Sequence, residues 1–483
     1  MLAALLLHRV YTSLSGPRLF SALAHRTMSK LGKLIALETM LFCLFAQAAD
    51  TTASKELSFT KEEYRLIATL APKILPPPPQ DKTNRFADNP RAAEFGRRLF
   101  FDPRFSGRLL EGDNDGSVHT LGRKGDVGRV SCAGCHVARD GFLDSRTLGH
   151  SISLAAGWGR RHAPSLNDVG QAKLIMWDGR RDALYNQIFE AIESHVEMNS
   201  SRLFVAQQLS RYYKVEYESI FGHLPDFTNS QEFPQLPAEE TGCRPAGPNP
   251  KSACDGLLRG VPGDRSDFDG LTAEKQEAVT RAVVNMGKAI GSYERKLSCG
   301  QGRFDAWAHG KSGALSAPEL RGLKLFIGRA KCVQCHSGPY LSDHNFHNVG
   351  LIPQTVAVVF RDVVDEGAYG GIMAAAKDPL NSRGRFSDGD DGRLPGAPGL
   401  ELKGAYKTPM LRCVGQRLAF MHTGQITDLG AVIDFFDRGG SPRPPIGVNE
   451  IKPLELSSSE KADLLLFLMT LNGPGSAQKW LSP

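Results

Sequence analysis

The sequence contains the spacing Cys-x-x-Cys-His twice, in "SCAGCH" at residues 131–136 and in "KCVQCH" at residues 331–336. Two thiols at this spacing can form thioethers to a porphyrin, and the adjacent imidazole can reach its iron. A zinc ribbon would need further Cys or His pairs, and a thioredoxin-like site would not need the histidine. The motifs therefore predict two covalently bound c-type haems. The haem-binding residues would be Cys132, Cys135 and His136 for the first and Cys332, Cys335 and His336 for the second; the cysteines would attach the porphyrin, and the histidines would be the proximal iron ligands.

A helical pattern stands directly before each motif. In "NPRAAEFGRRLFF", Asn89 is a suitable N-cap and Pro90 suits the first helical position. Before the second motif, Ser316 and Glu319 have the spacing of a capping box. The repeated order of helix and motif indicates an internal repeat.

Two more helical patterns begin at Thr272 and at Ser457, where Glu460 completes another capping box. Few stretches alternate apolar and polar residues with the period of a strand. The chain is therefore predicted to be mostly α-helical with long loops.

Composition divides the 483 residues into segments. Basic residues, an apolar run and the small residues Ala46–Ala48 predict a leader with a signal peptide over residues 1–48. The stretch "PPPPQ" favours an extended N-terminal arm over 49–82. We then expect an N-terminal domain at 83–299, with a Pro-, Gly- and Asp-rich insertion at 222–270, and a C-terminal domain at 300–483.

The formal charge of +6 comes mostly from the leader, and no dense stripe of Lys and Arg indicates a nucleic-acid partner. With the signal peptide removed, no membrane span is expected, and the protein is predicted to be periplasmic. In an exported chain, Cys243, Cys254, Cys299 and Cys413 could form two disulfides, with Cys243–Cys254 the easiest local pair. The sequence does not fix this pairing, and free buried thiols remain an alternative for Cys299 and Cys413.

Several segments spread along the chain carry a family resemblance. They include "GRRLFFDPRFSG", "RRHAPSLNDV", "MWDGRRDALYNQ", "SHVEM", "FHNVG", "YKTPMLR" and "FMHTGQITDLGAVIDFFDRGG", together with the two haem motifs. On these segments the chain resembles the bacterial di-haem cytochrome c peroxidases, a family that also contains MauG. The resemblance implies an all-α fold of two cytochrome c-like domains, each with one covalently bound haem. It also implies that the N-terminal haem reacts with hydrogen peroxide while the C-terminal haem takes in electrons.

The resemblance assigns roles to three further residues. Glu197 in "SHVEM" matches the distal acid and base, because a carboxylate over the iron can take a proton from peroxide and return it. Gln187 matches a second distal polar group, and Trp177 matches the tryptophan between the haems. Read from the residues alone, Glu197 and Gln187 would be solvated helix residues and Trp177 a core residue.

The sequence departs from the family pattern at three places. His150 in "TLGHS" is either a removable distal ligand of the first haem or a loop histidine, and the sequence leaves both open. His162 stands where the family usually has an asparagine that contributes to a calcium site, which makes calcium doubtful. Phe436 stands where the family has the axial ligand of the second haem, so that iron either lacks a protein ligand or takes Met421 or His422.

The sequence therefore predicts a di-haem c-type peroxidase, in which electrons pass from the C-terminal haem to the N-terminal haem. Its donor would be a small redox protein, a cytochrome c or a cupredoxin. One alternative is a MauG-like enzyme that uses peroxide to oxidise Trp or Tyr residues of a partner protein. Another is a non-catalytic di-haem electron-transfer protein.

Overall fold

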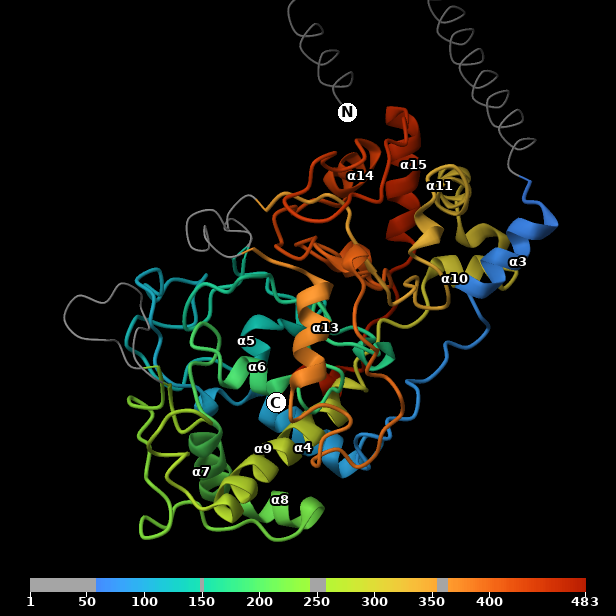
Figure 1. Cartoon of the computed structure of the whole chain (residues 1–483). Coiled ribbons are helices and arrows are strands. Elements are labelled where there is room, and N and C mark those ends of the chain that lie inside the picture. The colour runs from blue at the N-terminus through green and yellow to red at the C-terminus, as the bar shows by residue number, and fades with distance from the viewer. Residues whose placement is uncertain (1–57, 148–151, 244–257, 354–363) are drawn as a thin grey trace, which may run out of the picture. The chain divides into compact units, whose positions relative to one another are not determined.

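The structure is a computed structural model that describes residues 58–147, 152–243, 258–353 and 364–483 (Figure 1). The predicted leader at 1–48, His150 and Cys254 lie outside these ranges. The described helices are α3 Lys61–Leu70, α4 Pro90–Phe101, α5 Cys132–Cys135, α6 Ile188–Ile192, α7 Arg202–Tyr212, α8 Lys214–Phe221, α9 Ala273–Glu294, α10 Arg303–Ala308, α11 Ala317–Ile327, α13 Ala368–Lys377, α14 Leu429–Asp437 and α15 Ser458–Met469.

Four short strands accompany these helices. Strand β1 (Gly242–Cys243) pairs antiparallel with β2 (Leu258–Arg259), inside the predicted insertion. Strand β3 (Phe346–His347) pairs antiparallel with β4 (Tyr406–Lys407), with Phe346 opposite Lys407. The described chain is therefore mostly helical, with two small sheets.

The structure confirms the predicted N-termini of the helices that precede the two motifs. The Asn89 side chain accepts a hydrogen bond from the backbone N–H of Arg91 at 2.8 Å, and Pro90 occupies the first position of α4. At α11, the backbone N–H of Ser316 donates to the Glu319 carboxylate at 2.8 Å, as a capping box requires. Ser457 and Glu460 form the same arrangement at α15.

The prediction of an extended arm over 49–82 is wrong for Lys61–Leu70, which forms helix α3. Thr60 and Glu63 make a full capping box at its start. Ile67 and Leu70 lie on one side of this helix and are buried in the second core described below. The proline run begins only after this helix ends, so the extended conformation that it favours does not reach residues 61–70.

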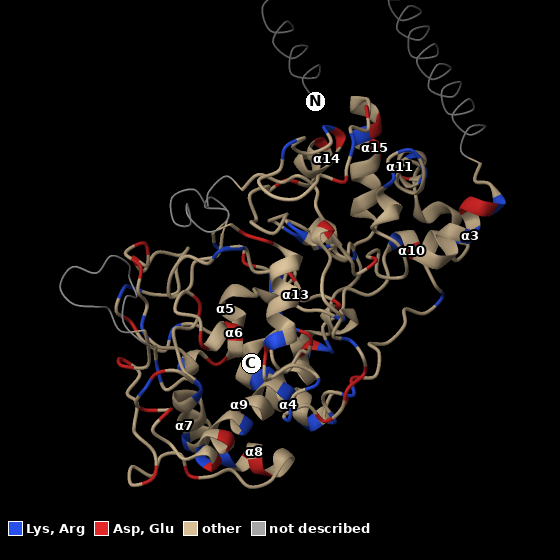
Figure 2. Ribbon diagram, in the orientation of Figure 1, with Lys and Arg blue, Asp and Glu red and all other residues tan. Residues whose placement is uncertain are grey.

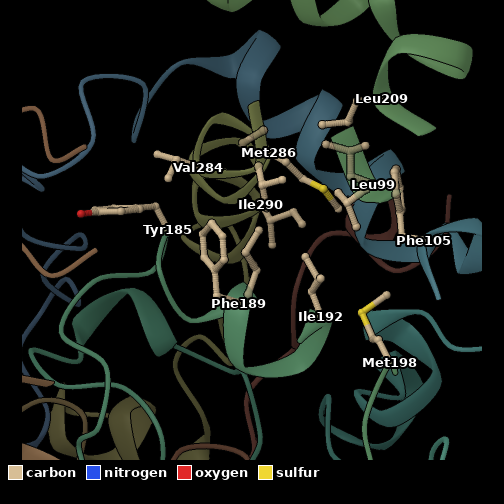
Figure 3. Packing of buried hydrophobic residues seen from close by; sticks show 14 of the residues in the cluster. Leu99, Phe105, Tyr185, Phe189, Ile192, Met198, Leu209, Val284, Met286 and Ile290 are labelled. Atoms are coloured by element: carbon tan, nitrogen blue, oxygen red, sulfur yellow. The ribbon is translucent and has the colours of Figure 1, made fainter. Parts of the chain in front are cut away.

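The first hydrophobic core is built around helices α4 and α9, which lie against each other (Figure 1). Figure 3 shows Leu99 of α4 beside Met286 and Ile290 of α9, with Phe189 and Ile192 of α6 below them. The helices approach closely because α4 has Gly96 at the contact. A Cβ atom there would lie 1.9 Å from the carbonyl oxygen of Ala289.

A second core repeats this arrangement around helices α11 and α15. Gly322 of α11 faces α15, and a Cβ atom there would lie 2.0 Å from the carbonyl oxygen of Asp463. Helix α3 joins this core, and the ring of Phe59 packs 5.5 Å from Trp307 of α10. In each core, two helices that are in close contact at a glycine thus lie next to one Cys-x-x-Cys-His motif.

Two strong links tie distant segments together. Cys299 and Cys413 form a disulfide, so the alternative of free thiols is wrong for this pair. Cys243 is also disulfide-bonded, although its expected partner Cys254 lies outside the described residues. Arg412 is fully buried and pairs with Asp305 at 2.9 Å.

Phe59–Pro483 forms one compact unit, and the division of this region at residues 299 and 300 stays a prediction.

Charged residues of both signs are mixed along the described part of the chain: Figure 2 shows Lys and Arg interspersed with Asp and Glu. Within the described residues, none of the helices is both long enough and apolar enough to span a bilayer.

Candidate haem and peroxide site

The first Cys-x-x-Cys-His motif forms the single helical turn α5, which packs against α4. His136 follows this turn, and its Nδ1 lies 2.9 Å from the carbonyl oxygen of Phe142. A bond to Nδ1 fixes the ring orientation and leaves Nε2 available for a metal. Burial lowers the pKa of His136, which favours the neutral imidazole that iron binds.

The motif lies on the wall of a cavity of about 520 Å³. Its apolar lining includes Phe100, Leu184, Ile188, Met286 and Ile290, so the helix pair that forms the first core also shapes this cavity. Glu197, Gln187 and Trp177, separated along the chain from the motif, line the same cavity. The structure thus brings all three predicted site residues together with Cys132, Cys135 and His136.

Glu197 lies in the turn after α6, where its backbone N–H donates to the Ser194 carbonyl at 3.2 Å. Its own carbonyl accepts from Ala156, which ties the turn to a neighbouring loop. Burial raises the pKa of Glu197 to about 7, although the charge of Arg180 acts in the opposite direction. A carboxyl group with this pKa can both accept and return a proton near neutral pH.

Gln187 stands at the start of α6, and its amide Nε2 donates to Oε1 of Glu294 at 3.1 Å. Glu294 is the last residue of α9, is 3% exposed and lines the cavity. Burial raises its pKa to about 8. Glu294 was not identified from the sequence. The available signal was its spacing: a glutamate four residues after an apolar residue such as Ile290 lies on the apolar face of the helix.

Trp177 is held by backbone groups from two other segments. Its indole N–H donates to the carbonyl of His162 at 2.9 Å, and its own carbonyl accepts from the Lys407 N–H on β4 at 2.8 Å. Both His162 and Lys407 also line the cavity. The segment around residue 162 therefore holds the indole, and strand β4 holds the backbone of Trp177.

The residues around this cavity fit a c-type haem. Cys132 and Cys135 are free thiols, and burial raises the pKa of each to about 12. Within the described structure, three polar atoms of the lining are buried without a hydrogen-bond partner: His162 Nε2, Glu294 Oε2 and Arg417 Nε. Unpaired buried polar atoms are rare in folded proteins and indicate a missing polar group. Thiols, a fixed imidazole and unpaired polar atoms around a largely apolar cavity suit a porphyrin with polar edges.

The second motif repeats the geometry of the first. Cys332 and Cys335 are free, and Nδ1 of His336 lies 2.9 Å from the carbonyl oxygen of Leu341. Burial lowers the pKa of His336 to about 4, so the ring is neutral. Helix α11 of the second core leads directly to this motif. The donor set therefore fits a second c-type haem.

Phe436, Met421 and His422 are the residues considered from the sequence at the further ligand position of the second haem. Phe436 is half-buried on α14, and its ring packs 5.5 Å from that of Phe435. Met421 lines the first cavity. The ring of His422 stacks on Tyr406 at a centroid distance of 3.5 Å, and burial lowers its pKa to about 3.

His162, at the position relevant to calcium, is buried and turns its Nδ1 toward the Ala163 carbonyl at 3.1 Å. Among the residues that the structure describes, no group of three or more His, Cys, Asp or Glu side chains is arranged to hold a metal ion.

Comparison with known proteins agrees with this chemistry. Residues 90–236 match the family model of the di-haem cytochrome c peroxidases. The methylamine utilization protein MauG of Methylorubrum extorquens is 28% identical over 445 residues, which cover 91% of this chain and 94% of that protein. A cytochrome-c peroxidase, IdrP1 of a Pseudomonas species, is 28% identical over 439 residues, which cover 88% of this chain and 92% of that protein.

Solved structures share the fold. The di-haem peroxidase BthA of Burkholderia thailandensis has a TM-score of 0.53 and 18% identity, and the match covers 85% of this chain and 96% of that one. A MauG-like protein associated with microbial copper homeostasis has a TM-score of 0.51 and 21% identity, with 85% and 97% covered. Over most of its length the chain is therefore similar to MauG and to the di-haem cytochrome c peroxidases, and these matches support an oxidoreductase that acts on peroxide and carries two covalently bound c-type haems.

Proposed function

We propose that this protein reduces hydrogen peroxide at the first haem site with electrons that enter through the second. The observation that carries the proposal is the single cavity shared by His136, Glu197, Gln187 and Trp177. The haem, when bound, supplies the iron that takes up peroxide and the electrons that break the O–O bond. The residues of the chain supply binding, orientation and proton transfer.

Each residue has a distinct part in this scheme. His136 would hold the iron, because the Phe142 carbonyl fixes its Nδ1 and leaves its Nε2 available. The carboxylate of Glu197 accepts a proton from peroxide and returns it to the departing oxygen, as its pKa of about 7 allows. The amide of Gln187 orients peroxide, and Trp177 carries electrons toward the cavity from the second site.

The electron donor in this scheme is a small exported redox protein, a cytochrome c or a cupredoxin. A periplasmic location is supported by the buried Cys299–Cys413 disulfide, because such bonds persist in oxidising compartments. It is also supported by the haem motifs behind a predicted signal peptide.

Replacing Glu197 by Gln tests the proposal. We expect peroxide turnover by the holoprotein to fall roughly 10²- to 10⁴-fold, because general acid and base catalysis contributes about this much. Haem content, read from the absorption spectrum, should stay unchanged. The exposed Glu239→Gln variant is the control and should keep full turnover. Normal turnover in Glu197→Gln would remove this residue from the mechanism.

A second function is supported by the match to MauG over 91% of the chain. In this scheme the protein uses peroxide to oxidise Trp or Tyr residues of a partner protein. Low-temperature EPR of the ferric holoprotein, before and after one equivalent of peroxide without reductant, separates the two. Prompt loss of a high-spin signal would favour the MauG-like function. Two low-spin signals that respond to peroxide only after half-reduction would favour the scavenging peroxidase, and no response in either state would favour an electron carrier.

A further inference from the structure

Glu294 is the one cavity-lining carboxyl group, besides Glu197, whose pKa is raised in the described structure. It is the last residue of helix α9, which packs in the first core. Oε1 accepts the Gln187 amide hydrogen at 3.1 Å, whereas Oε2 is buried and has no hydrogen-bond partner. A buried oxygen on a cavity wall with no partner indicates a contact that the occupant of the cavity completes.

The charge state of Glu294 follows from its surroundings. Burial raises its pKa to about 8. Its titratable neighbours are the Cys132 thiol on α5 and the Tyr293 hydroxyl on α9, and Cys132 no longer titrates once it forms a thioether. Arg97 of α4 interacts with Tyr293. At neutral pH, Glu294 is therefore a neutral carboxylic acid, which has one O–H group to donate.

We infer that Glu294 is a second polar residue of the peroxide site, which fixes the Gln187 amide through Oε1 and donates a hydrogen bond from Oε2 into the cavity. This inference rests on the proposed function, because it names a further contact for the same small ligand. Gln187 gives one amide hydrogen to Glu294, which turns its amide into a set orientation. Glu197 would transfer protons, whereas Glu294 would stay protonated and hold the ligand in place.

The inference is tested with cyanide, which binds ferric haem without any peroxide chemistry. The Glu294→Leu variant lacks both contacts, and we expect its cyanide dissociation constant to rise about five- to tenfold, the size of one lost hydrogen bond. Glu294→Gln keeps a carbonyl acceptor and an N–H donor, so its affinity should stay within about twofold of the wild type. Glu274→Gln, an exposed change on the same helix, is the control.

Two results would overturn the inference. Cyanide affinity equal to the wild type in Glu294→Leu would show that Glu294 makes no contact with a ligand. Equal weakening in Glu294→Gln and Glu294→Leu would show that Glu294 acts through its charge. If the leucine variant does not take up haem, infrared difference spectra of the holoprotein decide. The wild type minus Glu294→Gln must show a protonated carboxyl band below pH 8 that disappears above it, and absence of this band also overturns the inference.

This experiment separates the inference from the proposed function. Loss of turnover in Glu197→Gln with unchanged cyanide affinity in Glu294→Leu would reject only the role of Glu294. Unchanged turnover in Glu197→Gln with weakened cyanide binding in Glu294→Leu would reject only the catalytic role of Glu197.

Discussion

At the scale of single residues, the carboxyl groups that line the cavity differ in pKa because they differ in their ion-pair partners. Glu190 contacts both Arg180 and Arg181, and these ion pairs lower its pKa despite burial. Glu197 lies nearby without such a pair, and burial raises its pKa to about 7. General acid and base catalysis commonly depends on such a difference in pKa, because only a group with a pKa near the working pH can both accept and donate a proton.

This difference predicts the pH dependence of the peroxide reaction. Because burial favours the protonated form of Glu197, its carboxylate is lost as the pH falls below about 7. We expect the rate of peroxide reaction with ferric holoprotein, measured by stopped flow, to fall about tenfold for each pH unit below this value. The Glu197→Gln variant should be slow and independent of pH in that range. A wild-type rate that stays constant through pH 7 would assign the base to another group.

At the scale of elements, one helix pair appears twice. Gly96 lets α4 touch α9 beside the first motif, and Gly322 lets α11 touch α15 beside the second. In both places the space for a Cβ atom is taken by a backbone carbonyl, which cannot move without shifting its helix. The close contact therefore sets the position of the motif that each helix pair supports.

Gly96→Ala should weaken the first core. Overpacking at a close contact costs about 1–3 kcal/mol, and here the new methyl group meets backbone atoms of Ala289. We expect a lower midpoint in chemical unfolding of the holoprotein, followed by haem absorbance. Gly112→Ala is the matched control, because nothing lies within 4 Å of a Cβ atom at Gly112. Equal midpoints for both variants would show that α4 and α9 are less tightly packed than described.

Local signals explain which elements the sequence could predict. Caps at Asn89, Ser316 and Ser457 mark helix starts through bonds within a few residues, so α4, α11 and α15 were predictable. The contact between Gln187 and Glu294 joins residues 107 positions apart, and no local pattern encodes it. Glu197 and Trp177 were found only by family resemblance, because a turn glutamate and an apolar-flanked tryptophan have ordinary explanations as well.

At the scale of the whole molecule, the two haem sites must exchange electrons for the proposed function. Trp177 contacts two other segments: its indole donates to the His162 carbonyl, and its backbone carbonyl accepts from Lys407 on β4. Strand β4 pairs with β3, which follows the second motif by ten residues. Trp177 therefore lines the cavity of the first site and is tied through β4 and β3 to the chain that follows the second motif.

Trp177→Phe should separate reaction with peroxide from supply of electrons. Phenylalanine keeps an aromatic ring in place but loses the N–H bond to His162 and is much harder to oxidise. We expect the ferric holoprotein to consume its first equivalent of peroxide normally, while steady-state turnover with a reduced donor falls by roughly tenfold, equivalent to about 1.4 kcal/mol of barrier. Trp307→Phe, which changes a tryptophan packed against Phe59 in the second core, should leave both rates unchanged. Equal steady-state rates for the two variants would mean that electrons reach the cavity without the indole, and the position of Trp177 would then serve packing alone.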